Sequence, residues 1–290
     1  MNKRNTLLGG LLAFMVLMTV ACGSHHQEST VADSTQTDSI TVVNERVTVM
    51  HDPTSNATII GLQDKATEQR VDLFKGSYDD SLLAALIPGE GARSAINVFL
   101  VKFPDGPTVL FDAGMGGEEG FMSLHQMKPE EVDAVCLTHL HPDHIGGLLA
   151  GDEALFPNAT LYLSETEKAS VSQWDKRSPL LDTWKKIQKA YAGRIETFAD
   201  NAALFDGKVQ SIPAPGHTPG HTLFRIGQCL IAGDIVHSQD LQLEHPEFCA
   251  RYDQDPTTAV ATRKEILAYV QNNHLQLCGA HCYEMFVSLK

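Results

Sequence analysis

The stretch Thr-His-Leu-His-Pro-Asp-His at residues 138–144 sets three histidines and one aspartate within six positions. It directly follows an apolar run at residues 132–137, which predicts a short buried strand that ends where the motif begins. His139 and His141 are two positions apart at that strand end, so both side chains can point the same way and bind one metal ion.

The second half of this motif predicts a second metal position. Pro142 suits the first turn of a helix, which places Asp143 and His144 at the N-terminus of that helix. Their side chains would then face a position beside the first one. Imidazole and carboxylate groups are ligands of zinc and similar first-row metals, and a cluster this dense is seldom explained by packing alone.

Three further candidate ligands follow predicted strands elsewhere in the chain. His217 lies in the Gly- and Pro-rich loop at residues 215–221, Asp234 follows an apolar run, and His281 follows the last predicted strand. Loops that follow strands converge at one end of a sheet, where binding sites form. We therefore expect these side chains to join those of residues 139–144.

The remaining pattern predicts a β-rich chain with interspersed helices, an α/β or α+β class. Apolar and β-branched runs predict strands at residues 95–101, 108–111, 132–137, 160–163, 209–212, 222–226, 229–232 and 275–278. Helices are expected from Ser164, with Glu167 as its capping-box partner, at residues 180–191, and at 256–273 behind an Asp255 cap.

Taken together, these motifs resemble the metallo-β-lactamase-fold superfamily. The order is H-x-H-x-D-H, then G-H-T-x-G-H, then Gly233-Asp234, then a late histidine, and the resemblance extends from about Ala95 to the end. The turn at residues 111–114 also matches the early D-x-G turn of that family. The fold implied is an αββα sandwich, in which two mixed β-sheets lie face to face and are flanked by helices.

The resemblance also implies a role for each ligand. Asp234 would bridge two divalent ions, for which zinc is favoured and Mn, Fe or Co are alternatives. The other ligands would divide between a first metal (His139, His141 and His217) and a second metal (Asp143, His144 and His281). Asp112 would orient ligands without binding metal, and His221 would pack beneath its loop. For His237 the sequence leaves two roles open, a place near the site or a turn cap.

Such a pair of ions, ~3.5–4 Å apart, would lower the pKa of a bridging water and so provide a hydroxide that attacks a carbonyl or phosphoryl centre. Asp143 and Asp234 are the candidates for steering the proton. The sequence has neither a G-x-S-x-G elbow nor a phosphate-binding P-loop, which disfavours other hydrolase classes.

Finer features indicate the branch of the family. A bridging carboxylate at Asp234 disfavours a β-lactamase. The run at residues 233–237 resembles methyl-parathion-hydrolase-like enzymes and quorum-quenching lactonases, although residues 282–286 depart from that pattern. We therefore expect a small-molecule lactone, ester or phosphotriester as substrate. The alternatives are a glyoxalase-II-like thioester hydrolase and a non-catalytic zinc-binding lipoprotein.

Composition and the first residues bear on partners and localisation. The formal net charge of −14 disfavours nucleic acid as a partner.

A basic start, an apolar run at residues 7–20 and Ala21-Cys22 predict a signal peptide over residues 1–22, with Cys22 as a lipoprotein site or, alternatively, a plain secretory signal. Residues 23–45 read as a polar tether and residues 46–290 as the hydrolase domain. The protein would be exported to the periplasm or outer membrane and would meet the membrane only through its lipid. No feature predicts an oligomeric state.

The cysteines and aromatic residues give weaker signals. Five cysteines follow Cys22, and buried packing is the favoured role, although Cys278 and Cys282 could pair or tune the site. Phe121, Trp174 and Tyr283 are candidates for an apolar pocket, with ordinary core or surface positions as the alternative.

Overall fold

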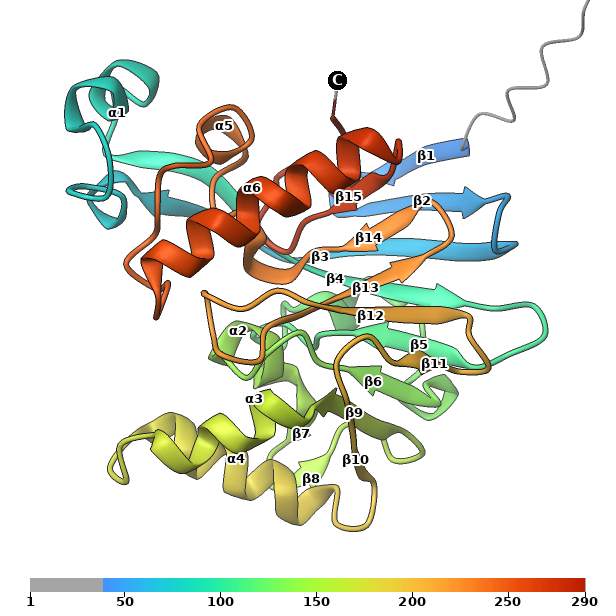
Figure 1. Cartoon of the computed structure of the whole chain (residues 1–290). Coiled ribbons are helices and arrows are strands. Elements are labelled where there is room, and N and C mark those ends of the chain that lie inside the picture. Colours follow the sequence, from blue (N-terminus) through green and yellow to red (C-terminus); the bar gives the residue numbers. More distant parts are fainter. Residues whose placement is uncertain (1–38, 290) are drawn as a thin grey trace, which may run out of the picture. The chain divides into compact units, whose positions relative to one another are not determined.

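The computed structural model describes residues 39–289, and its folded part is built on two large β-sheets (Figure 1). The larger sheet has the order β1-β2-β3-β4-β5-β6-β9-β10. Its strands are β1 (Ser39–Asn44), β2 (Val47–Asp52), β3 (Ala57–Arg70), β4 (Gly91–Lys102), β5 (Thr108–Phe111), β6 (Ala134–Cys136), β9 (Thr160–Ser164) and β10 (Ile195–Phe198). Pairing is antiparallel from β1 to β5 and parallel from β5 to β10, so the sheet is mixed.

The smaller sheet has the order β11-β12-β13-β14-β15-β16. Its strands are β11 (Ala203–Leu204), β12 (Val209–Pro213), β13 (Thr222–Ile226), β14 (Cys229–Ile231), β15 (Gln276–Cys278) and β16 (Val287–Ser288). Only the β14–β15 pair is parallel among the described strands of this sheet. A separate hairpin pairs β7 (Leu149–Ala150) with β8 (Glu153–Ala154).

The helices lie mainly on the outer faces of the sheets. They are α1 (Asp80–Leu86), α2 (Pro142–Ile145), α3 (Glu165–Ser170), α4 (Pro179–Ala190), α5 (Gln239–Gln242) and α6 (Pro256–Asn272). Single 3-10 turns, among them η6 (Gly233–Ile235), connect other elements. The Asp255 side chain accepts a hydrogen bond from the Thr258 amide, 3.1 Å away, and so caps α6 as expected.

Alternation along the strands divides the core into layers, because successive side chains of a strand point to opposite faces. On β5, Val109 and Phe111 face the second sheet, where Phe224 lies 5.2 Å from the Phe111 ring. Leu110 points the other way, into the cluster that α4 covers with Trp184. Helix α6 covers the second sheet from outside, as Figure 1 shows. The αββα sandwich of two mixed sheets is therefore confirmed.

The predicted strands all correspond to strands of the structure, but one boundary is wrong. Residues 39–44 form β1 and pair with β2, so the range expected to be a tether to residue 45 already contains the first strand. Every residue of β1 is exposed, including Ile40 and Val42, so the strand buries no face against the core and its position could not be inferred from a core pattern. The signal peptide and Cys22 lie outside the described residues.

Two further findings concern the described chain. The five cysteines of residues 39–289 are buried and form no disulfide with one another; Cys278 packs between the two sheets and Cys282 beneath α6, as the packing role predicts. No helix within residues 39–289 combines the length and apolar character that a membrane crossing requires.

Candidate metal centre

The structure brings all seven predicted ligands together from four loops, each of which follows a strand. The loop after β6 carries His139 and His141, and α2 begins at Pro142 as predicted, with Asp143 and His144 in its first turn. The other three residues follow β12, β14 and β15, namely His217, Asp234 and His281. Their donor atoms form two groups that are each suited to a metal ion.

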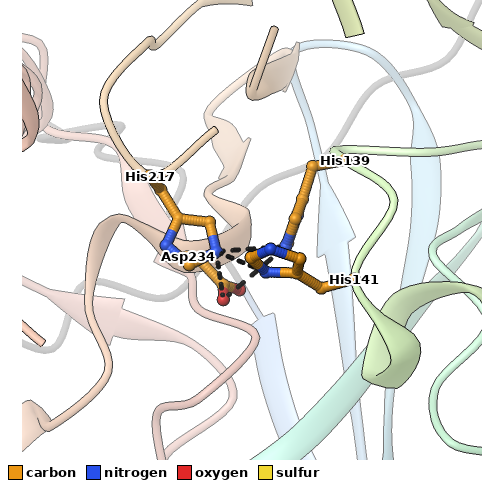
Figure 2. A group of neighbouring side chains, drawn as sticks. All are labelled: His139, His141, His217 and Asp234. Carbon is orange, nitrogen blue, oxygen red and sulfur yellow. Dashed lines mark hydrogen bonds and ion pairs between the residues drawn. The ribbon is translucent and has the colours of Figure 1, made fainter. Parts of the chain in front are cut away.

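The first group contains His139, His141, His217 and Asp234, whose donor atoms all lie within 4.8 Å of one another. The Nε2 atom of His217 lies 2.9 Å from His141 Nδ1 and 3.2 Å from His139 Nε2. The same atom lies 3.1 Å from Asp234 Oδ2. Figure 2 shows these donor atoms converging on one point between the two sheets' loops. Three imidazoles and one carboxylate around one point fit a zinc-like ion.

The second group contains Asp143, His144 and His281. His281 Nε2 lies 3.5 Å from Asp143 Oδ2 and 3.2 Å from Asp234 Oδ1. His144 Nε2 lies 2.9 Å from the same Asp234 oxygen. One oxygen of Asp234 therefore faces each group, which is the arrangement that a bridging carboxylate requires.

Unpaired polar atoms test whether this site fits metal ions. His144 Nε2 and Asp234 Oδ1 are buried at ion-pair distance from each other, 2.9 Å, yet neither atom makes a well-formed hydrogen bond within the described residues. A buried polar atom without a partner is costly, and such atoms are uncommon in native proteins. A divalent cation held between the two groups would satisfy both atoms, so the residues present fit a pair of metal ions.

The charges of the cluster point the same way. Burial alone would raise the pKa of Asp234, but the nearby charges of His281 and His144 outweigh it and hold that pKa well below its usual value. Burial lowers the pKa of His141 to about 4, so its imidazole is neutral and keeps a lone pair for a metal. For His217, burial is outweighed by the charge of Asp234, which raises the pKa to about 9, so this ring must release a proton when it binds a metal. The carboxylate of Asp234 is therefore ionised although it is buried, and it needs positive charge beside it, which a metal ion would supply.

Hydrogen bonds fix the orientation of several candidate ligands. His144 Nδ1 lies 2.8 Å from Asp112 Oδ2, and His281 Nδ1 lies 2.9 Å from the Ala95 carbonyl oxygen. Asp112 also accepts from the Thr138 amide and hydroxyl, 2.8 Å each. These contacts leave the Nε2 atoms to face the metal positions, which is the orienting role expected of Asp112.

A buried ion pair supports His217 and was not found from the sequence. Asp253 Oδ1 lies 3.0 Å from His217 Nδ1, and Asp253 Oδ2 lies 3.0 Å from the Arg263 guanidinium. Arg263 is fully buried and also donates to the backbone oxygens of Ile235, Pro246 and Phe248. Neither residue belongs to a ligand motif, so only the three-dimensional arrangement reveals the pair.

The two remaining histidines of the site differ in their contacts. His221 uses both ring nitrogens on the backbone, with Nδ1 3.2 Å from the Ala214 oxygen and Nε2 accepting from the Asp234 amide at 3.0 Å. It therefore packs beneath the loop, as the resemblance implies. His237 is also buried, stacks on His281 at 5.5 Å, and its Nε2 lies 3.4 Å from Asp234 Oδ2. Its two ring nitrogens have no hydrogen-bond partner among the described residues.

The capping-box expectation for Glu167 is only half met. Ser164 Oγ accepts from the Glu167 amide at 3.0 Å, as an N-cap should. The Glu167 side chain does not return to the cap, however. It accepts from the amides of Leu140 and Gly220 at 3.1 Å each and from the Thr218 hydroxyl at 2.7 Å, all in loops that carry candidate ligands.

Of the three aromatic pocket candidates, only Trp174 lines a cavity beside the site. The cavity has a volume of about 230 Å³ and includes His141 in its wall. Phe121 is buried in the core beside Phe156, so its pocket role is wrong. Tyr283 donates to Asp240 at 2.8 Å, and Arg93 lies 3.8 Å above its ring.

The chain belongs to the metallo-beta-lactamase superfamily, because the domain profile of that family matches residues 91–270. Among curated relatives, the uncharacterized protein YobT of Bacillus subtilis is 28% identical over 57% of this chain and 69% of its own length. The probable metallo-hydrolase YflN of the same organism is 30% identical over 48% of this chain and 60% of its own length. A hydroxyacylglutathione hydrolase of Psychromonas ingrahamii is 33% identical over 37% of this chain, which is about a third (34%) of that protein.

Two solved structures have the same fold over most of their length. The hydrolase AbOPH of the beta-lactamase superfamily has a TM-score of 0.73 at 27% identity, over 84% of this chain and 92% of its own. AidC, a dizinc quorum-quenching lactonase, has a TM-score of 0.73 at 22% identity, over 85% of this chain and 96% of its own. The family match and the shared fold therefore make the chain a metallo-hydrolase of this superfamily.

Proposed function

We propose that this protein is a dinuclear metal-dependent hydrolase that opens lactones or cleaves related esters and phosphotriesters. The observation that carries the proposal is Asp234, whose two oxygens face separate groups of candidate ligands. The histidines 139, 141 and 217 would hold one ion, and Asp143, His144 and His281 the other. Zinc is the favoured metal on affinity, with Mn, Fe or Co as alternatives.

Two bound divalent ions would supply a water of lowered pKa and draw electron density from the substrate oxygen. The residues of the chain perform the other tasks. Asp112 and Asp253 hold His144 and His217 in the orientation that exposes Nε2. Asp143, which is half-buried, and Asp234 are placed to take up or pass on a proton.

His237 is a candidate to contact the substrate. It is buried beside Asp234 and His281, yet its two ring nitrogens have no hydrogen-bond partner among the described residues. A ring N–H in this position can donate to the oxygen that gains negative charge during attack on a carbonyl. The wall of the neighbouring cavity, formed in part by Trp174 and Leu180, can accept an apolar substituent.

The substrate class rests on motif and fold together. Residues 233–237 resemble those of quorum-quenching lactonases, and AidC, which is described as such an enzyme, shares the fold. The match to hydroxyacylglutathione hydrolases favours thioesters as the second candidate. The proposed export of the protein, as a lipoprotein anchored at Cys22, favours lactones because glutathione thioesters belong to the cytoplasm.

The test is proton release in a pH-stat from an acyl lactone, an aryl ester and a glutathione thioester, each mixed with metal-loaded protein. We expect saturable release from the lactone that a chelator abolishes. Preference for the thioester would replace the lactone with the second candidate. Protein that binds two metals but is inert toward all three substrates and toward an aryl phosphotriester would contradict the hydrolase proposal and favour metal storage.

A further inference from the structure

Glu167 is a buried carboxylate outside every candidate metal group, although it contacts two of the loops that supply ligands. Its side chain is 2% exposed. One oxygen accepts from the Leu140 amide, and Leu140 stands between His139 and His141. The other oxygen accepts from the Thr218 hydroxyl and the Gly220 amide, and Thr218 directly follows His217. One carboxylate therefore contacts both loops of the first group.

These two loops come from different sheets. The first follows β6 of the larger sheet, and the second connects β12 and β13 of the smaller sheet. The start of α3, which carries Glu167, fits closely against the second loop, because a methyl group at Gly220 would overlap the backbone of Glu167. Ser164, the cap of α3, also donates to the Gly220 oxygen at 2.8 Å. The contact is thus a tight and specific junction.

We propose that Glu167 is a positioning residue that sets the spacing between His217 and the pair His139 and His141. The inference rests on the proposed function in that these histidines bind a metal ion. A carboxylate is suited to this task, since its two oxygens accept from three donors while it donates nothing. Glu167 makes no described hydrogen bond to Asp143, His144 or His281, so its direct contacts are confined to the neighbours of the first group's histidines.

The chemistry of the junction predicts which substitution breaks it. In Glu167→Gln, the amide oxygen can replace only one carboxylate oxygen, while its NH₂ group would face the N–H of either Leu140 or Gly220. One of the two loops is then released, and the first metal position loses its spacing. Glu165, an exposed carboxylate on the same helix, provides a matched control in Glu165→Gln.

The experiment titrates the metal-free full-length protein with Co²⁺ and follows the visible absorption and the affinity of each binding step. For Glu167→Gln we expect one step to weaken by roughly 10–100-fold, with an altered absorption band for that ion, while the other step keeps its affinity. Glu165→Gln should match the wild type in both steps. Unchanged affinities and spectra in Glu167→Gln would overturn the inference, as would an equal weakening of both steps in a variant whose circular dichroism matches that of the wild type.

A second pair of variants serves if Glu167→Gln does not fold. Thr218→Val removes one donor to Glu167 at nearly constant volume, and Thr218→Ser retains the hydroxyl. We expect the valine variant to weaken the same binding step and the serine variant to restore it; equal behaviour of the two variants would count against the inference. Wild-type protein that binds fewer than two ions would instead contradict the proposed dinuclear function, so the two failures are distinguishable.

Discussion

His144 Nε2 and Asp234 Oδ1 lie 2.9 Å apart in the interior, at ion-pair distance, and neither atom makes a well-formed hydrogen bond within residues 39–289. Asp234 comes from the loop after β14 in the smaller sheet, whereas His144 lies on α2, behind β6 of the larger sheet. The two sheets thus meet at this pair. A cation between them would link the two halves of the sandwich as well as serve the chemistry.

Removing the bridging charge should separate the two metal positions. We expect Asp234→Asn to retain at most one ion per chain and to lose about 100-fold or more in kcat, because an amide cannot supply an anionic oxygen to both groups. Metal content by elemental analysis, measured alongside hydrolysis, checks this. Two bound ions with full activity in this variant would rule out a bridging role.

Metal removal should lower stability as well as activity. Ligand that binds only the folded state adds about 2.7 kcal/mol when its free concentration is 100 times its Kd. A chelator should therefore lower the melting temperature and abolish hydrolysis together, and added zinc should restore both. Thermal scans with and without chelator make the measurement. An unchanged melting temperature after metal removal would contradict the metal site.

Substitution of Asp253 should change the pH dependence of stability. Burial opposes its ionisation, but the hydrogen bond to His217 and the charges of His237 and Arg263 hold its pKa below the usual value. A lowered folded pKa adds stability that is present above about pH 4 and lost as the pH falls through the folded value.

In metal-free Asp253→Asn, Arg263 is left as an unpaired buried charge, so we expect a loss of about 3 kcal/mol at pH 7. The difference from the wild type should shrink as the pH falls below about 4. Urea unfolding at several pH values measures both effects. A constant difference across the range would show that the Asp253 charge does not contribute.

The role of His237 can be separated from metal binding. His237→Phe keeps a ring to stack on His281 but removes both nitrogens, so we expect two bound ions and a kcat reduced by about 100-fold. His237→Gln keeps an N–H donor and should recover part of that loss. Steady-state kinetics with metal analysis decides, and loss of metal in His237→Phe would make His237 a ligand instead.

Trp174 should affect substrate preference without affecting the fold. Its side chain lines the cavity beside His141, so Trp174→Ala should raise KM about tenfold for substrates with a long apolar chain and leave short-chain substrates unchanged. Phe121→Ala is the contrasting variant, since that ring lies in the core and its removal should destabilise the protein by about 3 kcal/mol or more. Equal KM changes for short-chain and long-chain substrates would show that the substrate's apolar chain does not bind in this cavity.

Local sequence determined the elements and the identity of the candidate ligands. A strand at residues 108–111 places Val109 and Phe111 on one face and Leu110 on the other, and Pro142 suits the first turn of a helix. Spacing within residues 139–144 likewise fixes which side chains can act together. These are properties of neighbouring residues, so they can be predicted without knowledge of the fold.

Tertiary structure decided which distant groups meet. Glu167 is a good partner for its own helix cap, yet its carboxylate contacts Gly220, 53 positions away, because two loops with free N–H donors surround it in the interior. Asp253 and Arg263 likewise form a buried pair because the fold brings them together away from water. Burial away from water makes every unpaired polar group costly, and which partner satisfies each one depends on how the two sheets pack rather than on local spacing.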